Sequence, residues 1–194
     1  MAVQLTARFE EALDYAFRLH GVQKRKKTGR PYFGHLMGVT ALVLQYGGDE
    51  DLAIAALLHD AVEDCGGRPR LEEIRVKYGE RVAHVVEGCT DSFAIDPKQK
   101  AEWRPRKEEY IAHVRGADAD TRLVSAADKL HNVREIILDH RAHGEEIWER
   151  FAGRRDGSLW YYRTLVGAFR DGWSHPIVDE LEREVSELEH IATG

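Results

Sequence analysis

The longest apolar run of the chain, Leu52–Leu58, ends directly at His59 and Asp60. A helix that carries apolar side chains on every face has to be enclosed by other elements, so we expect this segment at the centre of the fold. An imidazole and a carboxylate are costly to place at the end of a buried helix unless something binds them. The run therefore predicts a helical core with a polar site at its end.

Helical periodicity extends over nearly the whole chain, and no segment alternates apolar and polar residues over a useful length. We therefore expect an all-α fold. Thr6 and Asp49 are suited to cap the first and third helices, and we expect the third helix to end near Cys65. The expected helices cover about residues 6–20, 35–46, 49–65, 71–78, 80–89, 105–115, 120–138, 145–151, 158–169 and 177–191.

The length and the cysteines favour one self-sufficient domain, residues 1–194. A chain of this size buries about 70% of its unfolded surface, so it needs no disulfide. The two thiols, Cys65 and Cys89, favour a reducing compartment. The N-terminus shows no secretory signal, and the longest apolar run is far shorter than the ~20 residues of a membrane span. We expect a soluble, cytoplasmic protein.

The net charge of −6 argues against nucleic acid and anionic membranes as partners, because both prefer a basic surface. The charge does not exclude a local basic pocket. Five cations lie within residues 24–30, among them Arg25, Lys26 and Arg30. This segment is either a phosphate-binding loop or a solvated turn. The sequence leaves the oligomeric state open.

His59 and Asp60 have two further candidate partners, His35 and Asp128. Two histidines and two aspartates form a nitrogen and oxygen ligand set for one divalent metal, and such a metal turns water into a nucleophile near neutral pH. Taken alone, His35 would be read as a surface or core histidine, and Asp128 as a buried ion-pair partner. Together, the four residues favour a metal site.

Glu63 and Asp64 follow His59 and Asp60 by one helical turn, so they lie on the same helix faces. Carboxylates just outside a metal's ligands can accept a proton from water or pass one to a leaving group. The alternative is that both are solvated acids at a helix end, where they would oppose the helix dipole.

Three segments together resemble the HD-domain phosphohydrolases, and more narrowly the RelA/SpoT-type alarmone hydrolases in their small single-domain form. Residues 25–35 read RKKTGRPYFGH, residues 56–64 read ALLHDAVED, and residues 127–132 read ADKLHN. The resemblance covers about residues 5–140 and leaves residues 141–194 as a helical extension. It implies an HD-domain helical bundle of roughly eight to ten helices around one metal site.

The resemblance also implies a reaction, the removal of the 3′-pyrophosphate from guanosine tetra- or pentaphosphate (ppGpp or pppGpp) to give GDP or GTP, as in the stringent response. The implied metal is manganese. The implied roles are metal binding by His35, His59, Asp60 and Asp128, activation of water by Glu63 and Asp64, phosphate binding by Arg25 and Lys26, and nucleotide contact by Lys129 and Asn132.

Two alternatives remain open. The same metal site would serve a phosphatase of another nucleotide, such as NADP(H) or a nucleoside monophosphate. A non-catalytic nucleotide sensor would need no proton-transfer groups, so the pair Glu63 and Asp64 argues against it. The aromatic residues 160–162 favour core packing over base stacking, and Trp103 is the better candidate for a lid contact.

Overall fold

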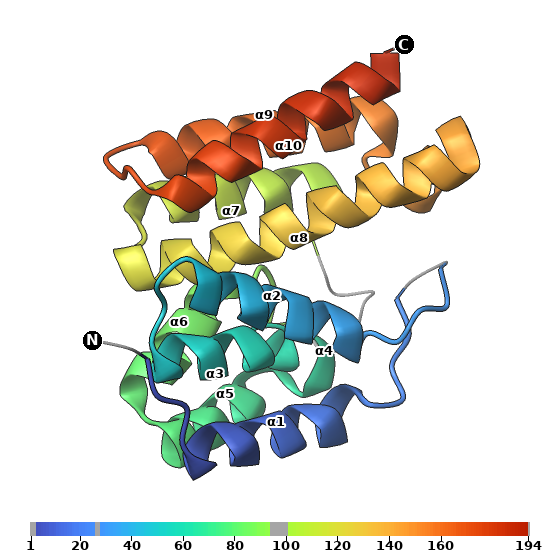
Figure 1. Cartoon of the computed structure of the whole chain (residues 1–194). Coiled ribbons are helices and arrows are strands. Elements are labelled where there is room, and N and C mark those ends of the chain that lie inside the picture. The colour runs from blue at the N-terminus through green and yellow to red at the C-terminus, as the bar shows by residue number, and fades with distance from the viewer. Residues whose placement is uncertain (1–2, 26–27, 94–100, 194) are drawn as a thin grey trace. The chain divides into compact units, whose positions relative to one another are not determined.

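The computed structural model describes residues 3–25, 28–93 and 101–193 (Figure 1). Within them it contains ten α-helices, one 3₁₀ helix and no β-strand, so the predicted all-α class is confirmed. The chain divides into two compact units. The first comprises Met1–Lys100 and Asp118–Ala127, and the second comprises Ala101–Ala117 and Asp128–Gly194. The organisation into a single domain stays a prediction.

The first unit is built around α3, as the apolar run predicts. Every residue of Leu52–Leu58 is buried, and six of the seven are completely inaccessible to solvent. Helix α3 packs against α1, α2 and α6 (Figure 1). The helices of this unit are α1 (Ala7–His20), α2 (Phe33–Gln45), α3 (Glu50–Leu58), α4 (Ala61–Cys65), α5 (Gly67–Tyr78), α6 (Glu80–Cys89) and the start of α8 (Ala119–His143).

The expected helix from residue 49 to residue 65 is wrong in one respect, because α3 ends at Leu58 and α4 begins at Ala61. Ring nitrogen Nδ1 of His59 lies 2.8 Å from the carbonyl oxygen of Ala56. In a continuous helix that oxygen would accept the amide of Asp60, so the side chain competes with the backbone for it. The resulting turn presents His59 and Asp60 as neighbours at the end of the core helix.

The two predicted N-caps are confirmed. The side chain of Thr6 accepts the amide of Arg8 at 3.2 Å, and that of Asp49 accepts the amide of Leu52 at 3.1 Å. Helix α2 begins at Phe33, two residues earlier than expected.

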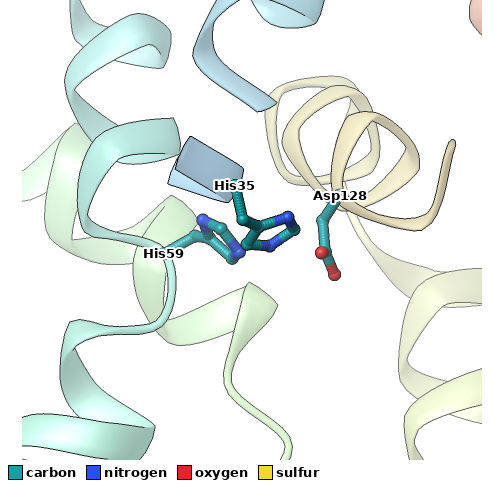
Figure 2. Close-up of side chains that lie close together, drawn as sticks. All are labelled: His35, His59 and Asp128. Atoms are coloured by element: carbon teal, nitrogen blue, oxygen red, sulfur yellow. The ribbon is translucent and has the colours of Figure 1, made fainter. Parts of the chain in front are cut away.

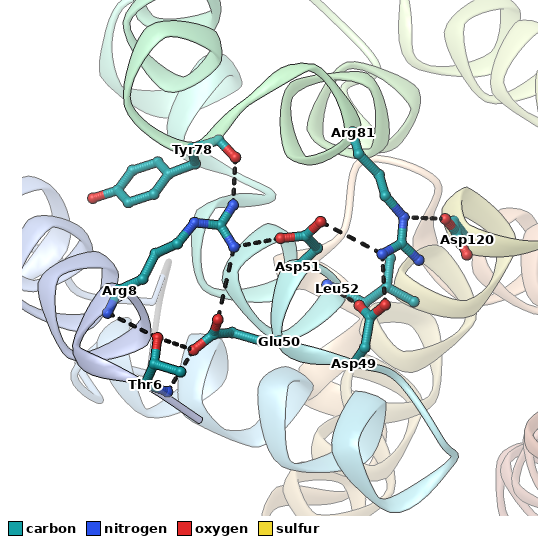
Figure 3. Close-up of polar contacts among 9 residues, drawn as sticks. All are labelled: Thr6, Arg8, Asp49, Glu50, Asp51, Leu52, Tyr78, Arg81 and Asp120. Atoms are coloured by element: carbon teal, nitrogen blue, oxygen red, sulfur yellow. Dashed lines mark hydrogen bonds and ion pairs between the residues drawn. The ribbon is translucent and has the colours of Figure 1, made fainter. Parts of the chain in front are cut away.

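A network of ion pairs joins the N-terminal ends of several helices in the first unit (Figure 3). Arg81 lies at the start of α6. Its Nη1 atom is 2.5 Å from Oδ2 of Asp49, at the start of α3, and its Nε atom is 2.8 Å from Oδ2 of Asp120, at the start of α8. Arg8 of α1 pairs with Asp51 and donates to the carbonyl oxygen of Tyr78. Aspartates at helix N-termini also interact favourably with the helix dipole. The network therefore fastens α6 to the starts of α3 and α8.

The second unit contains α7 (Trp103–Gly116), the remainder of α8, the 3₁₀ helix η2 (Gly144–Arg150), α9 (Arg154–Arg170) and α10 (Pro176–Thr193). The α-helix expected over residues 145–151 is therefore a 3₁₀ helix. Helix α9 packs against α7 and α10. A Cβ on Gly153 would lie 2.5 Å from Cη2 of Trp103, so this close packing requires glycine. Among the described residues, no helix combines the length and apolar character that crossing a bilayer requires.

Candidate metal and hydrolase site

Three of the four residues suggested as metal ligands lie together (Figure 2). His35 comes from the first turn of α2, His59 from the end of α3 and Asp128 from α8. One candidate ligand atom from each residue lies within 4.8 Å of the others, and all three side chains are buried. A small buried group of two imidazoles and one carboxylate has the donor atoms that divalent transition metals favour.

Asp60, the fourth suggested ligand, lies beside both histidines. Its Oδ2 atom is 2.8 Å from Nε2 of His59 and 3.7 Å from Nε2 of His35. The hydroxyl of Tyr32 donates a hydrogen bond to the same oxygen. The carboxylate of Asp60 therefore lies beside both histidines at the end of α3, but Asp60 does not belong to the group within 4.8 Å that includes Asp128.

The hydrogen bonding of His59 fits a metal ligand. Its Nδ1 atom donates to the carbonyl oxygen of Ala56, which assigns the hydrogen of a neutral ring to Nδ1. The lone pair of Nε2 then points to the side of Asp60 and His35. A histidine that is held through its second nitrogen by a backbone carbonyl is the usual arrangement around protein-bound metals. The donor set present here therefore fits a divalent ion.

The carboxylate of Asp128 has partners on both oxygens. Nζ of Lys129 lies 2.6 Å from Oδ2, and the side-chain nitrogen Nδ2 of Asn132 donates a hydrogen bond of 2.5 Å to Oδ1. Burial opposes the charge of Lys129, but the attraction of the Asp128 carboxylate outweighs it and raises the pKa of the ammonium well above its usual value. Lys129 and Asn132, which the resemblance assigns to the nucleotide, thus also orient Asp128.

The two residues suggested for activating water differ in exposure. Asp64 is exposed and Glu63 is half-buried. The backbone amide of Asp64 donates to the carbonyl oxygen of Asp60 at 2.9 Å, so Asp64 follows Asp60 by one helical turn, as predicted. The side chain of Asp64 accepts a hydrogen bond of 2.7 Å from Nε2 of Gln23. Sequence reasoning missed Gln23, whose only signal is its position directly before the basic segment.

The described residues at the two ends of the basic segment pair as the arms of a hairpin. Lys24 and Pro31 make an isolated antiparallel bridge, and the amide of Arg25 donates to the carbonyl oxygen of Arg30 at 2.9 Å. The guanidinium of Arg25 lies over the ring of Tyr32, 5.8 Å from its centroid. Because Tyr32 also binds a carboxylate of the candidate site, the hairpin brings Arg25 close to that site. Lys26 lies outside the described residues.

A pocket in the second unit gathers polar and aromatic side chains. Lys129 and Asn132 both contribute to it, together with Lys107 of α7, which sequence reasoning missed. Tyr161 and Tyr162 are buried, as the packing interpretation expects, and they also line the pocket. Its lining is Trp103, Lys107, Lys129, Asn132, Phe151, Ala152, Ser158, Tyr161 and Tyr162.

These features agree with what comparison with known proteins reveals. The family model described as "HD domain" matches residues 12–158. The chain belongs to the HD domain family. Members of that family use divalent metals, in keeping with the cluster of histidine and aspartate described above.

Within this family, the chain is similar to proteins named guanosine-3′,5′-bis(diphosphate) 3′-pyrophosphohydrolase. The Homo sapiens protein MESH1 is 35% identical over 133 residues, which cover 67% of this chain and 70% of MESH1. The Aquifex aeolicus protein of that name is 39% identical over 129 residues. That match covers 66% of this chain but only 17% of the longer Aquifex protein.

The fold is likewise shared with solved structures. One, described as a metazoan ortholog of SpoT that hydrolyses ppGpp, has a TM-score of 0.75 and 28% identity, and the match covers 97% of both chains. A protein of Listeria monocytogenes has a TM-score of 0.71 and 27% identity, covering 82% of this chain and 99% of that one. The expected HD-domain helical fold is thereby confirmed.

Proposed function

We propose that this protein is a metal-dependent hydrolase that removes the 3′-pyrophosphate from guanosine tetra- or pentaphosphate. Water is consumed, and the products are pyrophosphate and GDP or GTP. The observation that carries the proposal is the buried group of His35, His59 and Asp128 within 4.8 Å, with Asp60 beside both histidines. The named activity of MESH1 and of the Aquifex protein supports the substrate.

We assign His35, His59, Asp60 and Asp128 as the ligands of one divalent ion, with manganese as the resident metal. When bound, such an ion lowers the pKa of water and polarises a phosphoryl oxygen. The carboxylates of this ligand set suit manganese.

Glu63 and Asp64 are assigned to proton transfer. Asp64 lies one turn beyond Asp60 and is exposed to solvent, so it can reach a water molecule at the mouth of the site. A carboxylate there accepts a proton from the attacking water and returns one to the departing nucleotide oxygen. The half-buried Glu63 is placed next to it in the same turn.

Binding of a highly charged nucleotide requires cations and a surface for the base. Arg25, held over the ring of Tyr32, is assigned to phosphate together with Lys26, because a guanidinium can grip phosphate with two parallel bonds. Lys129 and Asn132 are assigned to the nucleotide. The pocket that they line also holds Tyr161 and other aromatic rings, on which a base can stack.

We propose that the partner of this chain is a small nucleotide. We also propose that the protein is located in the cytoplasm, where such nucleotides reside. The chain as a whole is taken as one hydrolase domain with its motif core over residues 5–140 and a helical extension over residues 141–194.

One experiment tests the substrate. Protein loaded with manganese is incubated in parallel with ppGpp, NADPH and a nucleoside monophosphate, and the products are identified by chromatography and mass spectrometry. GDP and pyrophosphate from ppGpp are expected, and both should disappear when a chelator is added. Faster release of phosphate from NADPH or from the monophosphate would instead favour the alternative function, a phosphatase that acts on another nucleotide.

A second experiment separates an enzyme from a nucleotide sensor. The variant Glu63→Gln should retain metal and bind ppGpp while turnover falls about 100-fold or more, because a proton-transfer group is lost. A wild-type protein that binds ppGpp without measurable turnover in any metal would instead support the sensor.

A further inference from the structure

A hydrogen-bonded row of three side chains leads from the core of the first unit to Asp64. Nδ1 of His20 lies 2.7 Å from Oε1 of Gln23, and Nε2 of Gln23 lies 2.7 Å from Oδ2 of Asp64. His20, the last residue of α1, is completely buried. Asp64 is exposed, so the row runs from a fixed interior group to a carboxylate at the surface.

The chemistry of Asp64 gives this row a single direction. An ionised carboxylate only accepts hydrogen bonds, so the atom of Gln23 that faces it has to be the amide nitrogen. The amide oxygen of Gln23 then faces His20, and the ring nitrogen at 2.7 Å has to carry a hydrogen. The orientation of the Gln23 amide therefore follows from the carboxylate, and the hydrogen on the ring nitrogen follows from the amide oxygen that it faces.

The other close neighbour of the His20 ring does not oppose this arrangement. The sulfur of Cys65 lies 3.9 Å from Nδ1 and 3.8 Å from Nε2, so it does not discriminate between the two nitrogens. Burial, followed by the charge of Asp64, raises the pKa of the Cys65 thiol to about 11. The thiol is therefore neutral at neutral pH and leaves the hydrogen on Nδ1 undisturbed.

The backbone holds Gln23 in place from two sides. Its amide donates to the carbonyl oxygen of His20 at 2.9 Å, and its own carbonyl oxygen accepts the amide of Tyr32 at 2.9 Å. Tyr32 stacks on His20 with a ring separation of 5.6 Å and an interplanar angle of 26°. The hairpin thus binds two carboxylates one turn apart on the same segment, Asp60 through Tyr32 and Asp64 through Gln23.

We propose that Gln23 is a positioning residue for Asp64 and that His20 sets its orientation. Gln23 donates a hydrogen bond to Oδ2 of Asp64, so that Oδ1 is the oxygen that exchanges a proton with water. The proposal rests on the proton-transfer role given to Asp64 in the proposed function. It adds two residues, His20 and Gln23, that touch neither metal nor substrate and act through Asp64.

Gln23→Glu tests this directly, because it keeps the size of the side chain and an oxygen toward His20 but replaces the donor that faces Asp64. We expect kcat to fall about 10–100-fold, the loss that is typical when a hydrogen-bond partner of a metal ligand is removed. Metal content should stay within about twofold of the wild-type value, since Asp64 is not an assigned ligand, and the loss should appear in kcat and not in KM alone. The matched control is Gln45→Glu at the exposed end of α2, for which kcat should not change.

An unchanged kcat in Gln23→Glu, or a change confined to KM, would overturn the inference while leaving the proposed function intact. Absence of turnover in the wild-type protein would instead contradict the proposed function. The row itself is then tested by correlating ¹⁵N and ¹H resonances of the imidazole of His20. Hydrogen on Nδ1 is expected in the wild-type protein, with loss of this preference in Gln23→Leu. Hydrogen on Nε2 in the wild-type protein would overturn the inference whatever the activity.

Discussion

The hydroxyl of Tyr32 donates a hydrogen bond to Oδ2 of Asp60, the oxygen that lies 2.8 Å from Nε2 of His59. Tyr32 belongs to the hairpin that carries Arg25, whereas Asp60 lies in the turn after the central helix. One side chain therefore links the segment assigned to phosphate with the segment assigned to the metal. This link gives the first prediction.

Tyr32→Phe should lower the affinity for manganese about 10-fold, because removal of a group that orients a ligand typically has effects of this size. The phenyl ring keeps the packing on His20, so the melting temperature should change little. Affinity is measured by titration calorimetry. The control is Tyr78→Phe, since the buried hydroxyl of Tyr78 has no hydrogen-bond partner among the described residues. Equal affinities for Tyr32→Phe and the wild type would contradict the role of Tyr32.

Asp128→Ala should lose bound metal and activity together. The substitution removes one of the assigned ligands and leaves the buried ammonium of Lys129 without its carboxylate, so the stability should also fall by about 3–5 kcal/mol. Metal content is measured by mass spectrometry and stability by urea denaturation. Asp14→Ala, an exposed aspartate of α1, is the control. Full activity in Asp128→Ala would show that the assigned ligand set is wrong.

Arg25→Ala should raise KM more than it alters metal content. A hydrogen bond to a charged group contributes about 1.5–3 kcal/mol, which corresponds to an increase in KM of about 10–100-fold. Steady-state kinetics with ppGpp and a metal assay check both parts. Arg18→Ala, an exposed cation near the end of α1, should leave KM unchanged. If metal content fell in Arg25→Ala while KM held, the phosphate role would be wrong.

The pH dependence of stability should report the pairing of Asp49 with Arg81. Burial opposes ionisation of Asp49, but hydrogen bonds from Arg81 and from the amide of Leu52 outweigh it and lower the pKa of the carboxyl. A lowered pKa in the folded state stabilises the protein above the unfolded value of about 3.9, and this contribution is lost as the pH falls through the folded value.

Asp49→Asn keeps an N-cap and removes only the charge. At neutral pH we expect a loss of about 0.5–1 kcal/mol, since both partners are partly exposed to solvent. The difference from the wild type should shrink in high salt and vanish in strong acid. Urea denaturation over a range of pH measures it, and a difference that persisted in acid would show that the ion pair is not its source.

Much of the fold could be predicted from the sequence, because its helices are specified locally. The apolar run Leu52–Leu58 had to be enclosed, and caps such as Thr6 mark a helix start whatever the helix packs against. The helix break after Leu58 could not be predicted, because it depends on which donor takes the carbonyl oxygen of Ala56. Periodicity records apolar faces and carries no information about that competition.

The sequence by itself determined an all-helical chain with a buried central helix that ends in a histidine and an aspartate. Only the tertiary structure decided that His35 and Asp128 lie next to His59, since these residues are far apart in the chain. The hydrogen bond between Gln23 and Asp64 is also visible only in the tertiary structure, since a single polar residue in a loop belongs to no periodic pattern. Local chemistry selects helices, whereas the partners of a side chain depend on which helices pack together.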